Sequence, residues 1–390
     1  MLFLDVTQSC RSSNNSGIQV VTRNLFGELD KLTKTTPMTW DTRLRKYARL
    51  SNSELTTLRK PFQEGYQPRL RPNKEENPFL KELLKSFLRF RRTIPLDRNR
   101  SKRDLIVFPE VFRDNRVHYL SGSLQPMLQK AGIFYDANVL RHSTSAPARR
   151  SKNFQAYLNF ISHCNMVSCI SNESEIVFRE FCEQTESSPK TKTHSLPAEA
   201  PISRKDIPIE EPPLILFVST LAYNKNHLCL LDAAERLWDE NIDFKLEFIG
   251  QADPSWAPQV EQRLKKMASR NRHAQWLRHV DQATLEERYS ACLFTVYPSL
   301  FEGCGLPILE SLVRGKPCLC GSNGALGEVA KGGGCLTIKD QGDPEVLANG
   351  IRQLLEDSKL RGKLTDEATI RNFGNWQEYA SSLLSFFLQK

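Results

Sequence analysis

The sequence predicts an α/β protein built from two doubly wound, Rossmann-like domains, and three observations support this fold class. The chain has 390 residues, which suits two domains of roughly 100 to 200 residues each. Short β-rich runs alternate with segments of helical length in both halves, a pattern typical of parallel sheets covered on both faces. A stretch with five prolines and no apolar periodicity, residues 197–213, separates the halves.

The elements of the first half follow this rhythm with one interruption. A strand is expected at 2–7 and a helix beginning near Gly17, and later strands at 104–110, 132–138 and 166–171. In the second half, strands are expected at 214–220, 244–250, 293–299 and 316–320. We therefore predict an N-terminal domain over 1–197, a linker over 198–212, a C-terminal domain over 213–372 and a final helix over 373–390.

The interruption is a basic insert over about 41–103. Residues 43–103 contain 18 Lys or Arg and 6 Asp or Glu, whereas the whole chain carries a net charge of +9. Within it, "NPFLKELLKSFLRFRRT" (77–93) predicts an amphipathic helix. Its apolar stripe either packs on the domain core, the usual fate of such a stripe, or lies on an anionic membrane. Core packing is the favoured interpretation.

Composition excludes several classes of protein. No apolar run approaches the roughly 20 residues that span a bilayer, and Asp5 interrupts the first one. We expect a cytoplasmic protein, with association at the cytoplasmic membrane face through 41–103 as the alternative. Ten single cysteines and seven histidines without ligand spacing predict no metal. The basic insert lacks the interleaved aromatics or motifs of nucleic-acid-binding modules, so no nucleic-acid partner is expected.

The strand at 293–299 is followed by "LFEGCGLPILESL". In open α/β sheets, ligands bind at the carboxyl edge of the strands, which is where Glu302 falls. Gly303 and Gly305 allow a turn whose backbone amides can approach an anion, and Pro307 suits the first turn of the following helix. Glu302 and Glu310 could then face one crevice and accept hydrogen bonds from sugar hydroxyls, although an exposed turn acid and a surface helix acid would give the same spacing.

A second cluster lies in "FVSTLAYNKNHLCLLDAAERL". Lys225 and Asn226 follow a strand and precede a helix, the position where helix N-terminal amides and a cation hold an anion. A solvated lysine is the alternative, but helix starts prefer acids to cations.

These stretches, with "GALGEVAKGGGCLTI" (324–338), resemble the nucleotide-binding domain of the retaining glycosyltransferases of family 4, the group 1 family with the GT-B fold. Glu302 and Glu310 match the Glu-x7-Glu signature of the family, and Lys225 matches its phosphate lysine. The resemblance spans roughly 213–390 strongly. It reaches the first half weakly, through "NSGIQVVTRNL" and "IFYDANVLRH".

The resemblance implies a GT-B enzyme whose two domains face a central cleft and bind a nucleotide sugar as donor substrate. Glu310 would hold the ribose, Lys225 the diphosphate, and Glu302 the transferred sugar. The remaining residues that it implies are Asn226, the amides of Gly303, Cys304, Gly305 and Leu306, Gly17 near the diphosphate, and, as weaker acceptor contacts, Asp136 and His142. No cofactor or metal is implied, because a lysine and helix dipoles can stabilise the departing diphosphate.

The implied activity is retaining transfer of a hexose or deoxyhexose from a GDP- or UDP-linked donor to a glycan or lipid-linked oligosaccharide, in surface polysaccharide or lipopolysaccharide synthesis. The chain departs from the family at Asn224 and Thr220, where a second clamp cation commonly stands; Arg141, Arg149 or Arg150 could substitute. Tyr135 also replaces a usual histidine. This departure motivates the alternative of a catalytically inactive, glycosyltransferase-like binding or scaffold subunit.

Overall fold

A computed structural model describes residues 1–12, 16–60, 78–96, 104–122, 128–136, 148–199 and 208–389. The chain folds into two compact units. The first comprises Met1–Ile170, Ser174–Leu196 and Trp376–Lys390, and the second comprises Ser171–Glu173 and Pro197–Asn375. The main boundary thus falls beside residue 197, and the C-terminal helix returns to the first unit.

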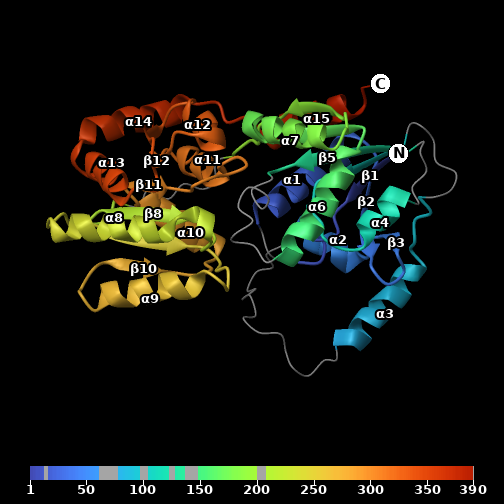
Figure 1. Ribbon diagram of the computed structural model, residues 1–390, viewed down its shortest axis with the longest axis horizontal. Helices are drawn as coiled ribbons and strands as arrows, with labels where there is room; N and C mark the ends of the chain where they lie inside the picture. Colours follow the sequence, from blue (N-terminus) through green and yellow to red (C-terminus); the bar gives the residue numbers. More distant parts are fainter. Residues whose placement is uncertain are drawn as a thin grey trace. The chain divides into compact units, whose positions relative to one another are not determined.

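The first unit is built on a seven-stranded sheet of order β3-β2-β1-β4-β5-β6-β7 (Figure 1). All neighbours pair in parallel except β2 and β3, which form an antiparallel hairpin. Its strands are β1 (Leu2–Asp5), β2 (Thr35–Asp41), β3 (Lys46–Arg49), β4 (Leu105–Phe108), β5 (Gln129–Phe134), β6 (Met166–Cys169) and β7 (Lys190–Thr193).

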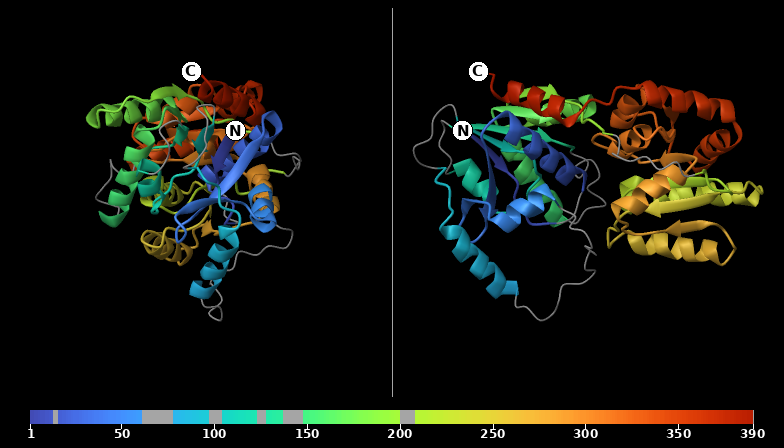
Figure 2. Two further views of the ribbon diagram at one scale, coloured as in Figure 1. Left: turned by 90° about the vertical axis from the view of Figure 1, so that its right-hand side faces the viewer. Right: turned by 180° about the vertical axis from the view of Figure 1, so that it is seen from behind.

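Helices pack against this sheet and against one another. The C-terminal helix α15 lies along α1, and α4 packs on α6 (Figures 1 and 2). The core holds aromatic side chains such as Phe108, Phe112 and Phe134, which are almost fully buried. The helices are α1 (Gly17–Leu32), α2 (Asn52–Arg59), α3 (Pro78–Phe90), α4 (Arg116–Gly122), α6 (Ala148–Ser162), α7 (Asn172–Gln184) and α15 (Trp376–Phe387).

The basic insert begins on the sheet, because β2 ends at Asp41 and β3 follows within it. The helix expected over 77–93 is confirmed as α3, but the expectation that its apolar stripe packs on the core is wrong. Leu84 and Phe87 are 62% and 64% exposed, whereas the polar residues Ser86 and Arg89 are buried. The physical reason is electrostatic, since the carboxylate of Asp41 accepts hydrogen bonds from both Ser86 and Arg89.

The second unit is built on a six-stranded, fully parallel sheet of order β10-β9-β8-β11-β12-β13. The four strands expected from sequence are present, and β10 and β13 extend the sheet at its two edges. Its strands are β8 (Leu214–Val218), β9 (Lys245–Ile249), β10 (Ala274–Trp276), β11 (Phe294–Tyr297), β12 (Cys318–Gly321) and β13 (Cys335–Ile338).

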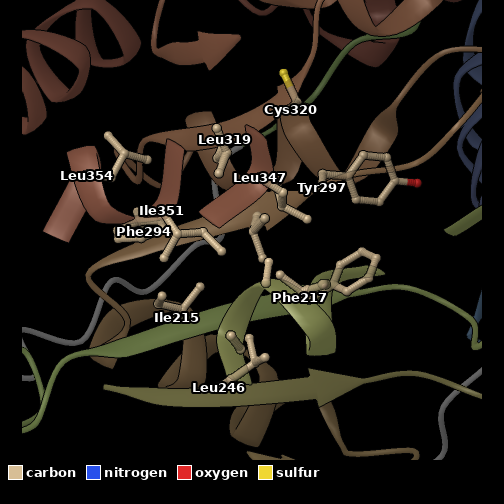
Figure 3. Packing of buried hydrophobic residues seen from close by; sticks show 14 of the residues in the cluster. Ile215, Phe217, Leu246, Phe294, Tyr297, Leu319, Cys320, Leu347, Ile351 and Leu354 are labelled. Atoms are coloured by element: carbon tan, nitrogen blue, oxygen red, sulfur yellow. The ribbon is translucent and has the colours of Figure 1, made fainter. Parts of the chain in front are cut away.

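The core of the second unit lies between this sheet and helices such as α8 and α13, which contact each other. Figure 3 shows Ile215, Phe294 and Leu319 from the strands meeting Leu347 and Ile351 from α13. The helices are the 3-10 turn η2 (Tyr223–Lys225), α8 (His227–Asp239), α9 (Ala257–Ala268), α10 (Gln282–Ala291), α11 (Leu306–Leu312), α12 (Gly324–Ala330), α13 (Pro344–Glu356) and α14 (Ser358–Ile370).

All ten cysteines are free thiols, and nine of them are buried. Over the ranges given above, none of the helices combines the length and the apolar character needed to cross a bilayer.

Candidate functional site

The two loops singled out from sequence follow β8 and β11, which are neighbours in the sheet of the second unit. From β8 the chain order runs outward to β9 and β10, whereas from β11 it runs in the other direction to β12 and β13. The strand order therefore reverses between β8 and β11, and the loops at the carboxyl ends of such strands are where open α/β sheets bind ligands.

Asn224 joins the two loops. Its backbone carbonyl accepts a hydrogen bond from the amide of Leu300 at 2.8 Å, and its side-chain amide donates to the carbonyl of Phe301 at 3.3 Å. The contact places the residue before Glu302 beside the residue before Lys225. Asn224 stands where the resemblance leads one to expect a second cation. Here its side chain instead links the loop after β8 to the loop after β11.

Lys225 and Glu302 form an ion pair, with side chains 17% and 13% exposed. Tyr297, the last residue of β11, completes the cluster: its hydroxyl accepts from Nζ of Lys225 at 2.7 Å and donates to Oε1 of Glu302 at 3.0 Å. Burial, together with the charge of Glu302, raises the pKa of Tyr297 well above its ordinary value. The phenol thus stays protonated and fixes the ion pair, and its oxygen points out of the core in Figure 3.

Asn226 positions the start of α8. It adopts a left-handed conformation with φ of 61°, and its side-chain amide donates to the carbonyl of Gln341 at 2.6 Å. The first amide bonded within α8 is that of Leu230, which donates to Asn226. The amides of the preceding residues at a helix start have no partner inside the helix, and they carry its positive dipole.

The glycine turn after Glu302 is shaped by Gly305, whose φ is 86°. A Cβ there would lie 3.3 Å from side-chain carbons of Ile308 and Leu326, so both conformation and space favour glycine. Cys304 is buried, and the carbonyl of Gly303 accepts from the hydroxyl of Ser171 at 2.7 Å. The amide of Leu306 opens α11, as the sequence predicts.

Glu310 lies on α11, and burial raises the pKa of its carboxyl group. Arg314, four residues later, does not pair with this carboxylate. It donates to both oxygens of Glu286 at 2.9 and 2.6 Å and stacks on the ring of Tyr289, with 4.4 Å to the ring centroid. It also donates to the backbone carbonyl of Glu310 at 2.6 Å. The site therefore brings together carboxylate, lysine and glycine turn, as the sequence pattern predicts.

Other candidate residues lie in the first unit. Gly17 is the first residue of α1, and Asp136 follows β5 and is half-buried. Tyr135 is buried and donates to the carbonyl of Pro109 at 2.7 Å, which is a structural contact. His142, Arg141 and the side chains of Arg149 and Arg150 lie outside the described residues.

Sequence reasoning missed three residues that organise the site: Tyr297, His227 and Gln341. The position of Tyr297 at the end of a strand beside the glycine turn could have identified it, because the last residue of a buried strand borders the loop. His227 is fully buried beside Phe217, with ring centroids 4.5 Å apart, and burial lowers its pKa to about 3.

No group of His, Cys, Asp and Glu suited to a metal ion occurs within the described part of the chain.

Comparison with known proteins identifies relatives of the second half of the chain. Residues 199–371 match the family model described as "Glycosyl transferases group 1". The O-antigen chain mannosyltransferase B of Escherichia coli is 29% identical over 166 residues, which are 42% of each chain. The D-inositol 3-phosphate glycosyltransferase of Corynebacterium glutamicum (strain R) is 24% identical over 179 residues, 45% of this chain and 43% of that protein. The match thus spans less than half the length of these curated relatives.

Solved structures resemble almost the whole chain. A sucrose-phosphate synthase from Thermosynechococcus elongatus has a TM-score of 0.69 at 15% identity, covering 99% of this chain and 98% of that one. The Anabaena protein Alr3699/HepE, in complex with UDP and glucose, has a TM-score of 0.63 at 14% identity, covering 98% and 99%. At these identities the likeness shows the fold alone, which is GT-B with two Rossmann-like domains.

Proposed function

Because residues 199–371 belong to the group 1 glycosyltransferases and the chain has the GT-B fold, we propose that the protein is a retaining glycosyltransferase. It transfers a hexose or deoxyhexose from a nucleoside-diphosphate sugar to a glycan or lipid-linked oligosaccharide. The observation that carries the proposal is the cluster of Lys225, Glu302 and Tyr297 at the point where the strand order reverses.

Lys225 binds the diphosphate in this proposal. Its ammonium is paired with Glu302, and α8 begins two residues after it, at His227. A cation together with a helix N-terminus is a good anion site, and a hydrogen bond from a charged group to phosphate contributes about 1.5 to 3 kcal/mol. Glu302 is then released to accept from hydroxyls of the transferred sugar, and Glu310 accepts from the ribose.

The reaction breaks the bond between the sugar's anomeric carbon and the diphosphate oxygen, and forms a bond from that carbon to the acceptor's hydroxyl oxygen. The proton of that hydroxyl leaves with the diphosphate, so the nucleoside diphosphate is the second product. Lys225 and the α8 amides stabilise the charge that develops on the leaving group. No metal or cofactor is part of this proposal.

The relatives suggest the substrates. Two relatives from Escherichia coli are named O-antigen chain mannosyltransferase B and serotype-specific mannosyltransferase WbdA. These names support mannose as the first candidate sugar and lipopolysaccharide or another surface polysaccharide as the product. The Anabaena structure was solved with UDP, so UDP- and GDP-linked donors are both candidates. A cytoplasmic location belongs to the same proposal.

The first experiment is a thermal-shift screen against UDP, GDP, dTDP, ADP and CMP, with and without Mg²⁺, on the wild type and on Lys225→Ala and Glu310→Ala. We expect one nucleoside diphosphate to raise the thermal midpoint of the wild type in the absence of Mg²⁺. The same nucleotide should not stabilise Lys225→Ala or Glu310→Ala. Lys363→Ala, which changes an exposed lysine of α14, is the matched control and should behave as wild type.

Turnover decides between the transferase and the inactive binding subunit. Release of nucleoside diphosphate from the matching nucleotide sugar, with a retained anomeric configuration in the product by NMR, supports the transferase. Nucleotide binding without turnover on any polysaccharide or lipid-linked acceptor would support the binding subunit. The absence of nucleotide binding would contradict the proposal that Lys225 binds the diphosphate and stabilises the leaving group.

A further inference from the structure

Helix α3 of the first unit presents its apolar side chains to solvent. Both figures of the whole chain show α3 projecting from the body of its unit (Figures 1 and 2). Five large apolar side chains along it are roughly half to two-thirds exposed: Leu83 48%, Leu84 62%, Phe87 64%, Leu88 53% and Phe90 61%. With 3.6 residues per turn, these five positions fill one continuous arc of about 160° around the helix.

The opposite edge of α3 is fixed to the unit by polar contacts. Arg89 is 4% exposed and donates to Asp41 at 3.2 Å and to Glu54 at 2.7 Å. Ser86 donates to Asp41 at 2.9 Å. Burial alone would raise the pKa of Asp41, but hydrogen bonds from the Leu44 amide, Ser86 and Arg89 keep it below its ordinary value. The carboxylate is therefore charged, and it holds the helix with its polar edge inward.

The chain after α3 is also anchored. The carbonyl of Arg92 accepts from the amide of Arg49, and the amide of Ile94 donates to the carbonyl of Tyr47, both on β3. Since α3 is held at its end and along one edge, the outward direction of its apolar arc is determined by the fold. Rotating the helix to bury the arc would bring Arg89 out and leave the buried carboxylate of Asp41 without its cation, which is unfavourable.

The exposed surroundings of the arc are basic. Lys85 and Arg91 on and beside α3 are exposed. Arg45 and Lys46 are exposed as well, and they follow Asp41, the last residue of β2, which contacts α3. The acids described nearest to α3, Asp41 and Glu54, face inward. Lys85 and Arg91 thus place positive charge on and directly after the helix that carries the apolar surface.

From this arrangement we propose that α3 docks the protein on the surface of an anionic phospholipid bilayer. The five apolar side chains enter the boundary between headgroups and acyl chains, while the Lys and Arg side chains bind the anionic headgroups. Charge favours this occupant over a second copy of the chain, because a two-fold contact through α3 would bring the basic residues of both copies together. The docking is independent of whether the chain has transferase activity.

Co-sedimentation with vesicles tests the proposal. We expect the full chain to bind vesicles of phosphatidylglycerol mixed with phosphatidylcholine, and to bind phosphatidylcholine vesicles at least tenfold more weakly. High salt should weaken the binding, because it screens the headgroup charge. Equal binding to both vesicles, or to neither, would overturn the proposal.

Two pairs of variants locate the surface. Leu84→Asp with Phe87→Asp should lower partitioning at least tenfold, whereas Ile370→Asp, at a residue 85% exposed on α14, should leave it unchanged. Lys85→Glu should lower partitioning about fivefold, with Lys359→Glu on α14 as its control. Unchanged thermal midpoints would show that all variants fold.

The competing occupants give different results. If α3 joins two copies, the wild type will be a dimer by light scattering without vesicles, and Phe87→Asp will make it a monomer. If the basic residues bind a free anionic glycan, soluble polyanion will compete away binding and the apolar substitutions will have no effect. Either result contradicts docking on a bilayer.

Discussion

Replacing Glu302 with glutamine should strengthen the binding of a nucleoside diphosphate while it abolishes sugar transfer. Nζ of Lys225 is paired with the Glu302 carboxylate, and the hydroxyl of Tyr297 contacts both. A diphosphate must therefore compete with Glu302 for the same ammonium. Glutamine keeps the shape of the side chain but removes its charge, so this competition for the Lys225 ammonium is weakened.

The size of the effect follows from the exposure of the pair. A hydrogen bond between charged groups contributes about 1.5 to 3 kcal/mol, and the pair is only partly shielded from water at 17% and 13% exposure. We therefore take a value around and below the lower end of this range, about 1 to 2 kcal/mol. Because about 1.4 kcal/mol corresponds to a factor of ten, Kd should fall about fivefold to thirtyfold.

Titration calorimetry with UDP and GDP measures this directly on wild type, Glu302→Gln, Lys225→Met and the double variant. Lys225→Met should weaken binding, and the double variant should bind like Lys225→Met, because Glu302 acts through that lysine. Glu356→Gln, at an exposed acid of α13, should change nothing. The reasoning is refuted if Glu302→Gln weakens the binding of UDP or GDP as much as Lys225→Met does.

Three other predictions concern the packing around the site and the first unit. Tyr297→Phe should lower kcat/KM about tenfold with little change in the thermal midpoint, because it removes only the hydroxyl that holds Lys225 and Glu302; a larger loss of stability than of activity would contradict this. His227 has a pKa of about 3 in the fold against 6.5 ordinarily, so only the unfolded chain takes its proton between these values. Its contribution to stability is complete above about pH 6.5 and falls by about 1.4 kcal/mol per pH unit below it. In urea unfolding, His227→Phe should remove about 2 kcal/mol of the loss between pH 7 and pH 5, and the exposed His273→Asn should not. Arg116 is 1% exposed and donates to Asp5 at 2.7 Å, so Arg116→Met should destabilise the first unit by about 3 to 5 kcal/mol in urea unfolding, because a buried carboxylate loses its cation.

The strands and the candidate site of the second unit were predictable because their signals are local in sequence. A buried parallel strand reads as a short apolar run, and the loop after it carries the ligand-binding residues, so Lys225 and Glu302 could be found without knowing that they touch. What the sequence could not show was the contact through which Tyr297 joins them. Tyr297 is the last residue of an apolar run, and only the pairing of β8 with β11 places its hydroxyl between the two charged groups.

The orientation of α3 was not predictable for a related reason. Its apolar periodicity is correct for a helix, but the face that a helix buries is decided by what the rest of the fold offers. Here that is a pair of carboxylates, Asp41 and Glu54, which lie 48 and 35 residues before Arg89 in sequence. Burying Arg89 against them satisfies three charges at once. A stripe of leucines and phenylalanines cannot displace that arrangement without leaving the buried Asp41 carboxylate without a cation.

The departure at residue 224 has a comparable explanation. Where the resemblance leads one to expect a cation, Asn224 uses its carbonyl and its side-chain amide to bind the loop that carries Glu302. An arginine at this position would lose the hydrogen bond from the Asn224 side-chain amide to the carbonyl of Phe301. Residue 224 therefore connects the two loops and does not supply a cation. In the proposed transferase, more of the diphosphate's charge is therefore stabilised by Lys225 and by the first amides of α8. Lys225→Met is therefore the variant on which the transferase proposal depends most.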